Sequence, residues 1–264
     1  MPLSNQRGVT LVASIILVVF ASVAVLSVTT FIVQRFSESR SRQRSLQSFY
    51  LAQAGINQAI YYYRFRDATG NGYFSLGQTN VDSSNYFVIG GTAADLLMAN
   101  TSAAALTSSN TRISNVTIQN ATNSSTITID RMVVSWAGAA PSRRLVEVVL
   151  NGGSVWSGTL ATPANADITN FILNTTPTLY SSNYLRFNNS MAGATYVDVQ
   201  FVMTDGSNKT VRFYPASNNF RFTVKAMGKT VGSNLYRTIQ AEYNAFNTAT
   251  GVLTDYREIN TLLP

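Results

Sequence analysis

The fold is decided by Val9–Val33, which reads VTLVASIILVVFASVAVLSVTTFIV. This run of 25 residues contains neither a charge nor a proline. As a helix it would extend roughly 37 Å, and the hydrocarbon core of a bilayer is about 30 Å thick. Buried helices of soluble proteins are rarely this long and this evenly apolar. We therefore expect a helix that spans a membrane.

Three interpretations of this run are open. In the first, the residues that end in Arg7-Gly8 form a short basic leader, which a peptidase removes. In the second, the run is a permanent membrane anchor. In the third, it is a secretory signal cut after the small residues at Ala21–Ala24, although such signals usually have apolar cores of only 7–15 residues.

The composition of the 264-residue chain disfavours several classes of function. Cysteine is absent, so the chain has no thiol nucleophile and no disulfide. Histidine, the commonest general base in enzymes, is absent as well. Of the formal net charge of +7, residues 1–45 supply five Arg and one Glu, and the rest is nearly balanced. Basic residues do not form a stripe with aromatic residues. We expect no enzyme activity, no cofactor, no metal and no nucleic-acid partner.

A helical pattern continues beyond the apolar run to about residue 66. Apolar residues step by three and four positions and predict one stripe along this stem helix. Turn residues at Asp67–Gly72 predict its end; a calcium loop there is the alternative, but the spacing lacks the ligand series of an EF-hand. We expect the stripe to pack against a folded head through Leu46, Phe49, Ile56, Ile60 and Tyr63.

The charges beside the apolar run conflict with its expected orientation. Four arginines follow the run and only Arg7 precedes it, so the positive-inside tendency would place the following segment in the cytoplasm. However, that segment is long, poor in charge and rich in Ser, Thr, Asn and Gly, as exposed β-proteins often are. We therefore expect it to face outward, and we expect Glu38 to pair with Arg42, four positions later.

The N-terminal quarter of the chain resembles a known family. A leader ending at Arg7-Gly8 and a long apolar helix from Val9 are similar to a class III signal of type IV prepilins. SFYLAQAGINQA, from Ser48 to Ala59, resembles the helix motif of PilX-type minor pilins. The resemblance implies that a prepilin peptidase cuts between Gly8 and Val9, and that the helix then leaves the bilayer for a filament core. Assembly contacts would be made by Val9, Leu11, Ala13, Ile16 and Phe20.

Two positions depart from the family pattern. Most major pilins carry Glu at the fifth position after the cut, where it neutralises the amino terminus of the preceding subunit; here that residue is Ala13. Val9 stands where Phe is commonest. A subunit that lacks this carboxylate would leave a charge unpaired in apolar surroundings. Ala13 therefore favours a position of this subunit at the filament tip. The alternative is that this chain is one of the many PilX-type chains that simply lack the Glu.

Beyond Tyr73 the pattern changes to the period of two that is typical of strands. Asn151-Gly152-Gly153 and Asp205-Gly206 are hairpin signals between strand runs. Residues 112–215 resemble an immunoglobulin-like module inserted in some pilin-like surface proteins, on the segments VSW (134–136), LNGGSVWSG (150–158) and FVMTDGS (201–207). Trp136 and Trp156 are interpreted as core residues, with sugar stacking as the alternative.

The remaining strands predict a second, smaller sheet. Residues 86–89, 220–227, 236–243 and 252–259 would form the head of a PilX-type pilin, and residues 92–111 would connect it to the inserted module. The expected division is a leader at 1–8, a transmembrane and stem helix at 9–66, a head at 67–111 with 216–264, and the inserted module at 112–215.

The sequence as a whole predicts an α+β protein, in which a long N-terminal helix packs on a small antiparallel sheet that carries an inserted β-sandwich. The expected function is that of a minor pilin or pseudopilin whose head serves adhesion, aggregation or secretion. Its partners would be other pilins, the assembly platform and the prepilin peptidase. It would lie in the inner membrane before assembly and then in a periplasmic or extracellular filament. The alternative is a single-pass membrane-anchored binding protein that is neither processed nor assembled.

Overall fold

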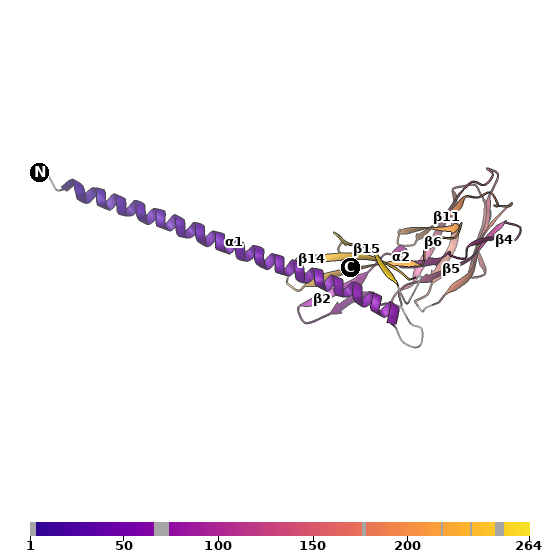
Figure 1. The fold of residues 1–264 in the computed structure, drawn as a ribbon, viewed down its shortest axis with the longest axis horizontal. Coiled ribbons are helices and arrows are strands. Elements are labelled where there is room, and N and C mark those ends of the chain that lie inside the picture. Colours follow the sequence, from indigo (N-terminus) through magenta and orange to yellow (C-terminus); the bar gives the residue numbers. More distant parts are fainter. Residues whose placement is uncertain (1–3, 66–73, 176–177, 218, 233, 246–250) are drawn as a thin grey trace. The chain divides into compact units, whose positions relative to one another are not determined.

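A computed structural model describes residues 4–65, 74–175, 178–217, 219–232, 234–245 and 251–264. One helix, α1 (Ser4–Phe65), contains 62 residues and includes the whole apolar run (Figure 1). The expected turn at Asp67–Gly72, and with it the calcium alternative, lies outside the described residues. The chain forms two compact units, residues 1–47 and residues 48–264. The second unit contains the end of α1 and all the strands.

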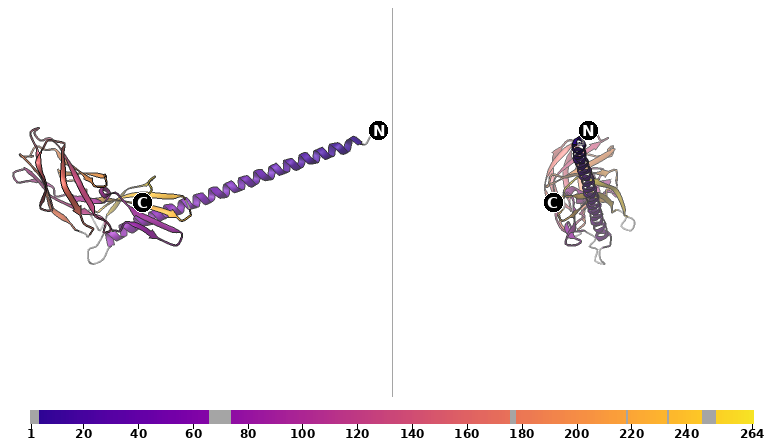
Figure 2. Two further views of the ribbon diagram at one scale, coloured as in Figure 1. Left: turned by 180° about the vertical axis from the view of Figure 1, so that it is seen from behind. Right: turned by 90° about the vertical axis from the view of Figure 1, so that its left-hand side faces the viewer.

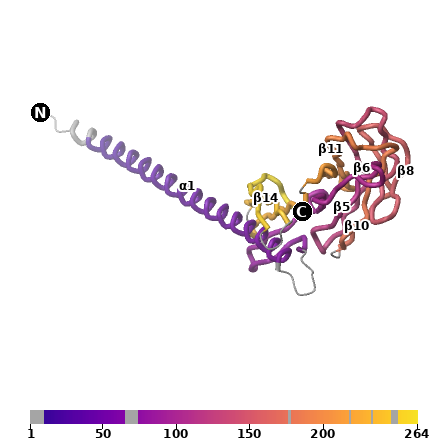
Figure 3. The backbone as a smooth tube through the Cα atoms, turned by 45° about the vertical axis from the view of Figure 1, so that its right-hand side comes forward, coloured from indigo at the N-terminus to yellow at the C-terminus, as the bar shows by residue number. Residues whose placement is uncertain are grey.

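A five-stranded antiparallel sheet lies against the last turns of α1. Its strands follow the order β1-β2-β13-β14-β15. The chain leaves this sheet after β2 and returns to it at β13, so that β14 lies near the end of α1 (Figure 3). β13 pairs with β2 over six residues of β2, from Asn85 to Gly90. The strands are β1 (Gly77–Asn80), β2 (Asn85–Gly90), β13 (Arg221–Thr230), β14 (Tyr236–Asn244) and β15 (Val252–Ile259). The expected second sheet is thus present, with β1 as an additional strand.

The residues between β2 and β13 form two further antiparallel sheets (Figure 2). One has the order β3-β5-β10-β7-β8, with β4 also paired to β5, and the other has the order β12-β11-β6-β9. We call residues 97–214 the two-sheet module. Its strands are β3 (Leu97–Asn100), β4 (Ala105–Thr107), β5 (Arg112–Asn120), β6 (Ile127–Ala137), β7 (Leu145–Leu150), β8 (Gly153–Leu160), β9 (Ala164–Leu173), β10 (Tyr180–Phe187), β11 (Tyr196–Met203) and β12 (Asn208–Tyr214).

The two sheets of the module pack their buried faces together. Buried and less buried residues alternate along β11, and largely along β6, as expected for strands with one face in a core. The ring of Trp136 on β6 meets Phe187 on β10 edge to face, with 5.3 Å between the ring centres. Trp136 is therefore a core residue, as predicted. Trp156 differs, because it lies on the end strand β8 and is only half-buried over Gly158.

Residues 92–111, which were expected to be a plain connection, contain regular structure. They form the short helix α2 (Ala93–Leu96) and the strands β3 and β4, both of which pair with β5. The sheets therefore begin at Leu97 rather than at Arg112. The Ala/Ser/Thr-rich composition concealed these strands, because small residues give a weak alternation signal although Leu97, Met98 and Ala99 are all buried.

Candidate assembly helix and its seat on the sheet

The N-terminal half of α1 is the only helix among the described residues that is long and apolar enough to cross a membrane. Its large side chains are exposed within the chain itself: Leu11 is 65% exposed, Ile16 50% and Phe20 72%. Ala13 is exposed as well. Gly8 and Val9 belong to the helix, but their side chains lie outside the described residues. Such a surface needs lipid or other helices to cover it.

Hydroxyl groups in this half of the helix bond within the helix. Ser14, Ser22, Ser27, Thr29 and Thr30 each donate a side-chain hydrogen bond to the carbonyl oxygen four residues earlier, at 2.8–2.9 Å. These bonds satisfy the hydroxyl donors without water, which suits an apolar environment. The polar side chains of the run are therefore no obstacle to burial in lipid or in a bundle of helices.

The ion pair in the following segment differs from the expected one. Glu38 lies 3.7 Å from the guanidinium of Arg35, three positions earlier, rather than pairing with Arg42. Both side chains are more than half exposed, so the pair adds little to stability. The segment remains a solvated, net basic stretch of helix.

The C-terminal turns of α1 sit on the five-stranded sheet through a stripe of mostly small side chains. Ser48, Ala52 and Ala59 are fully buried, together with the larger Ile56, and Leu51 and Tyr63 flank them. These positions repeat at three and four residues, so they share one helix face. Small side chains allow the helix backbone to approach the strands closely.

Two glycines make the closest part of this contact. At Gly55 a Cβ atom would lie only 2.8 Å from the Cβ of Ala226 and 2.9 Å from the ring of Phe87. At Gly228, on β13, a Cβ would overlap the carbonyl oxygen of Ser48 and lie 2.6 Å from the Ala52 nitrogen. Since backbone cannot rotate away as a side chain can, Gly228 fixes the distance between helix and sheet.

The predicted stripe therefore has the correct period, but the buried face is centred on other residues than those predicted. Ile56 and Tyr63 are buried as expected, and Phe49 and Ile60 pack at the border of the core. Leu46 is 57% exposed and does not belong to the stripe. The prediction followed the largest apolar side chains, whereas the sheet contacts the small ones.

We expect Ile56→Ala to destabilise the chain by about 2–4 kcal/mol, because its side chain is fully buried between helix and sheet. Leu46→Ala should change the free energy of unfolding by less than about 0.5 kcal/mol. Urea unfolding of the full chain in detergent micelles, followed by hydrogen exchange of residues 48–63, measures both. Equal costs for the two variants would contradict the register of the stripe.

Four aromatic rings pack together where the C-terminal end of α1 contacts the five-stranded sheet. Phe222 lies 4.8 Å from Tyr63, 5.2 Å from Phe74 and 5.5 Å from Tyr243, measured between ring centres. Phe74, Phe222 and Tyr243 are buried almost completely. Phe74 also forms a bridge with Thr122 of the two-sheet module. This cluster therefore joins helix, sheet and module in one core.

Helix α2 makes polar contacts with both the five-stranded sheet and the module, and we call this contact region the joint. The N–H of Ala93 donates to Asp205 at 2.8 Å and that of Ala94 donates to Ser207 at 3.0 Å, so the β11–β12 turn caps the helix. From the other side, the ammonium of Lys225 lies 2.7 Å from the carboxylate of Asp95.

Lys209 on β12 spans the same joint. Its ammonium donates to the carbonyl oxygens of Leu97, at 2.5 Å, and Arg221, at 3.0 Å. Burial lowers the pKa of Lys209 from 10.5 to about 8; the charge of Arg221 adds to this effect, and Glu242 and Asp95 oppose it. A charged lysine is thus held in the joint at neutral pH at a cost in stability.

We expect the free energy of unfolding to rise with pH in the alkaline range because of Lys209. Below pH 8 the lysine is charged in both the folded and the unfolded chain, and its penalty is constant. Between pH 8 and 10.5 the unfolded chain holds the proton and the folded chain does not, so stability rises with pH. Relative to Lys209→Met, the wild type should gain about 2–3 kcal/mol over this range. Urea unfolding at several pH values measures the difference; a constant difference would contradict the burial of this charge.

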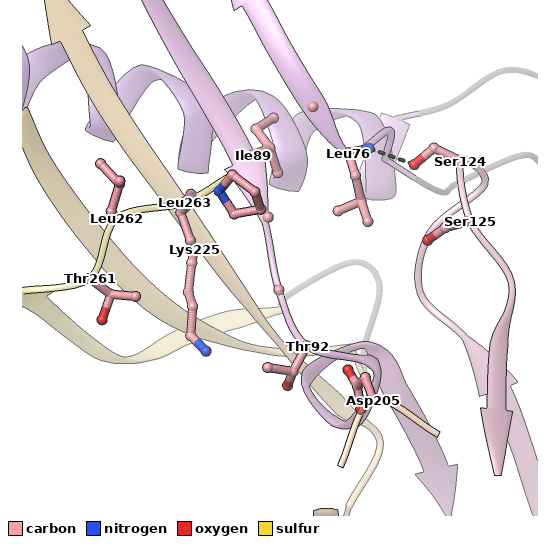
Figure 4. A pocket seen from close by; sticks show the side chains of 14 residues that line it. Leu76, Ile89, Thr92, Ser124, Ser125, Asp205, Lys225, Thr261, Leu262 and Leu263 are labelled. Carbon is pink, nitrogen blue, oxygen red and sulfur yellow. Dashed lines mark hydrogen bonds between the residues drawn. The ribbon is translucent and has the colours of Figure 1, made fainter. Parts of the chain in front are cut away.

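Two cavities lie beside the start of β1. The larger, about 560 Å³, is bounded by the end of β2, the C-terminal residues and the Ser124-Ser125 turn (Figure 4). The smaller, about 280 Å³, is lined by Gln58 and Tyr62 of α1 and by residues 74–79. The sequence predicted neither cavity, because their lining residues come from segments that are far apart in the chain.

No group of three or more acidic residues that could hold a metal occurs among the described residues. Comparison with family models, with curated proteins and with solved structures found no match to this chain. The described residues form an α+β protein with one long, exposed apolar helix and a β-rich domain.

Proposed function

We propose that this chain is a minor subunit of a type IV pilus or of a related secretion pseudopilus. The observation that carries the proposal is the division of α1 into two halves. In its apolar half the large side chains from Leu11 to Val33 are exposed, while its other half packs closely on a sheet through Ser48, Ala52 and Gly55. A simple anchor needs no such rigid grip, whereas a filament subunit must hold its head firmly on the helix that assembles.

Maturation would begin with removal of residues 1–8 by a prepilin peptidase, between Gly8 and Val9. The exposed side chains of Leu11, Ile16 and Phe20 would lie in the bilayer first and then pack against neighbouring helices. Their hydroxyl-bearing neighbours already satisfy their own donors, which favours transfer between the two surroundings.

Ala13 bears on the position of the subunit. A carboxylate at this place could neutralise the amino terminus of a preceding subunit, and an alanine cannot. A subunit at the tip has no preceding subunit and loses nothing by this change. The proposed position is therefore the tip of the filament.

The head would be presented on the outside of the filament, in the periplasm or beyond the cell. The five-stranded sheet on α1 supports a pilin-like head, and the two packed sheets at residues 97–214 support an immunoglobulin-like module. Half-buried Trp156 on the end strand β8 offers a surface for adhesion, aggregation or secreted cargo. The assembly platform and other pilins would be the remaining partners.

The second candidate is a single-pass membrane protein with a binding ectodomain. The exposed apolar half of α1 favours it to the same degree, because lipid alone would cover those side chains. The two candidates differ in what happens after insertion, since only a pilin is cut and leaves the membrane.

The two candidate functions can be distinguished by shearing surface filaments from cells and comparing the filament fraction with the membrane fraction. The chain contains no cysteine, so a single cysteine placed at Phe20 reports its neighbours without background. A photoactivatable cross-linker attached to the thiol of Phe20→Cys should give cross-linked products with other pilins in the sheared filament fraction, and only when the prepilin peptidase is present. Leu179→Cys, on an exposed residue of the module, is the matched control. Recovery of Phe20→Cys solely from the membrane, with or without the peptidase, would support the second candidate instead.

A further inference from the structure

The two edges of the five-stranded sheet differ in how well they are protected. β15 forms one edge and carries Asp255, Arg257 and Glu258, with a positive φ of 51° at Asp255 and an irregular register against β14. Charges and bulges of this kind prevent a further strand from pairing. β1 forms the other edge, reads GQTN, and pairs in regular register with β2. Among the described strands, it has no partner on its outer side.

The cavities flank this unprotected edge and have different walls. Both are lined by Leu76, Gly77 and Ile89, which lie where β1 begins. The larger cavity adds Leu262 and Leu263 and is mainly apolar, and its volume of about 560 Å³ lies within the range of ligand-binding pockets. The smaller adds polar side chains, among them those of Gln58, Ser75, Gln78 and Thr79.

Gly77 lies at the edge of the sheet and lines the larger cavity. It is exposed, it has a φ of +111°, and a Cβ atom there would meet nothing within 4 Å. The absence of a side chain at this place leaves open space at a position that lines the same cavity as Leu76 and Ile89. Figure 4 shows these two side chains among the residues that line the larger cavity. Glycine at an edge is commonly covered by a large side chain of an adjacent strand.

We propose that the outer edge of β1 binds an extended segment of a partner protein by strand addition. The backbone of the segment would pair with Gly77–Asn80. Because side chains alternate across a strand, an apolar residue would pass over Gly77 into the larger cavity, and its polar neighbours would lie toward the smaller one. The partner is thus an uncharged segment with alternating apolar and polar residues. This inference goes beyond the proposed function and holds whether or not the chain assembles.

A second copy of this chain does not fit the site. Its own β1 would offer Gln78, Thr79 and Asn80, which are polar and cannot fill an apolar cavity. Its other edge would bring Asp255, Arg257 and Glu258 against β1 without a complementary charge on GQTN. The occupant is therefore a segment of a different protein.

The test uses the full chain in detergent micelles and labelled seven-residue peptides, with empty micelles as the reference for partition. Fluorescence polarisation should show binding of a peptide that alternates leucine and threonine, and none of a serine–threonine peptide of the same length. N-methylation of alternate amides in the leucine peptide should abolish binding, because it removes the backbone donors without changing the side chains. Binding that survives N-methylation would overturn strand addition.

Variants of the chain locate the site. Leu76→Gln and Leu262→Gln should each weaken binding of the leucine peptide about tenfold, because each adds a polar group to the apolar wall. Leu179→Gln changes an exposed leucine of the module and should have no effect. Thermal unfolding shows that each variant is folded. Unchanged binding in both cavity variants, or a dimer of the chain itself that Gln78→Lys disrupts, would overturn the proposal.

Discussion

Gly228→Val should destabilise the chain by about 3 kcal/mol or more and loosen α1 from the five-stranded sheet. The side chain would have to occupy the space of the Ser48 carbonyl oxygen and the Ala52 nitrogen. Either the helix moves away, which opens the contact made by Ile56 and Ala59, or the strand bends. The two tryptophans lie in the two-sheet module, so hydrogen exchange of residues 48–63 and 221–230 is the suitable measurement.

The matched control for this prediction is Gly153→Val. Gly153 is also a strand residue, but a Cβ there would meet only the carbonyl oxygen of Leu150, at an ordinary 3.6 Å. Its cost should stay below about 0.5 kcal/mol. If Gly228→Val and Gly153→Val show the same hydrogen exchange at residues 48–63, the close contact between helix and sheet described above is wrong.

Phe222→Ala should destabilise the chain by about 3–5 kcal/mol. The ring is fully buried and touches Tyr63 of the helix, Phe74 beside the module and Tyr243 of β14. Its removal leaves a cavity at the point where three parts of the molecule meet, so none of them can close it alone. Urea unfolding in micelles, recorded both by tryptophan fluorescence and by hydrogen exchange of the helix, measures the loss.

Phe36→Ala is the control for this truncation, because it removes the same side chain from a position that is 65% exposed. It should leave both measurements unchanged. For Phe222→Ala, fluorescence and hydrogen exchange should shift together, since the cluster belongs to one core. A shift of the helix signal without any shift of tryptophan fluorescence would show that the module is stabilised independently of the cluster.

The sequence predicts the long elements well, because their signals are local. The apolar run needs only hydrophobicity and length to be recognised as a helix, and three of the four strands expected for the smaller sheet end within a residue of their prediction at Ile89, Tyr243 and Ile259. β3 was missed because it is buried on both faces and carries no alternation. Hydrophobicity does not reveal which face of the helix packs on the sheet. Ser48 and Gly55 lie on that face because their small side chains let the helix backbone approach the strands closely.

The candidate sites show the same limit. The apolar side chains Leu11, Ile16 and Phe20 could be named in advance because they belong to one uninterrupted apolar run, and all three are exposed. The cavities beside β1 could not, since they depend on how Leu76 and Ile89 come together with the C-terminal residues. Lys209 could not be singled out either, because a lysine on a β-strand gives no sign that it reaches two carbonyl groups across a joint.

The measurement that tests the central claim most directly is the N-terminal residue of the protein, made in cells with and without a prepilin peptidase. Intact mass and terminal peptide mapping read it without ambiguity. The pilin account predicts a chain that begins at Val9 when the peptidase is present and at Met1 when it is absent. A chain that begins at Met1 in both would contradict the account and identify a fixed membrane anchor; a start after Ala24 would contradict it in favour of ordinary secretion.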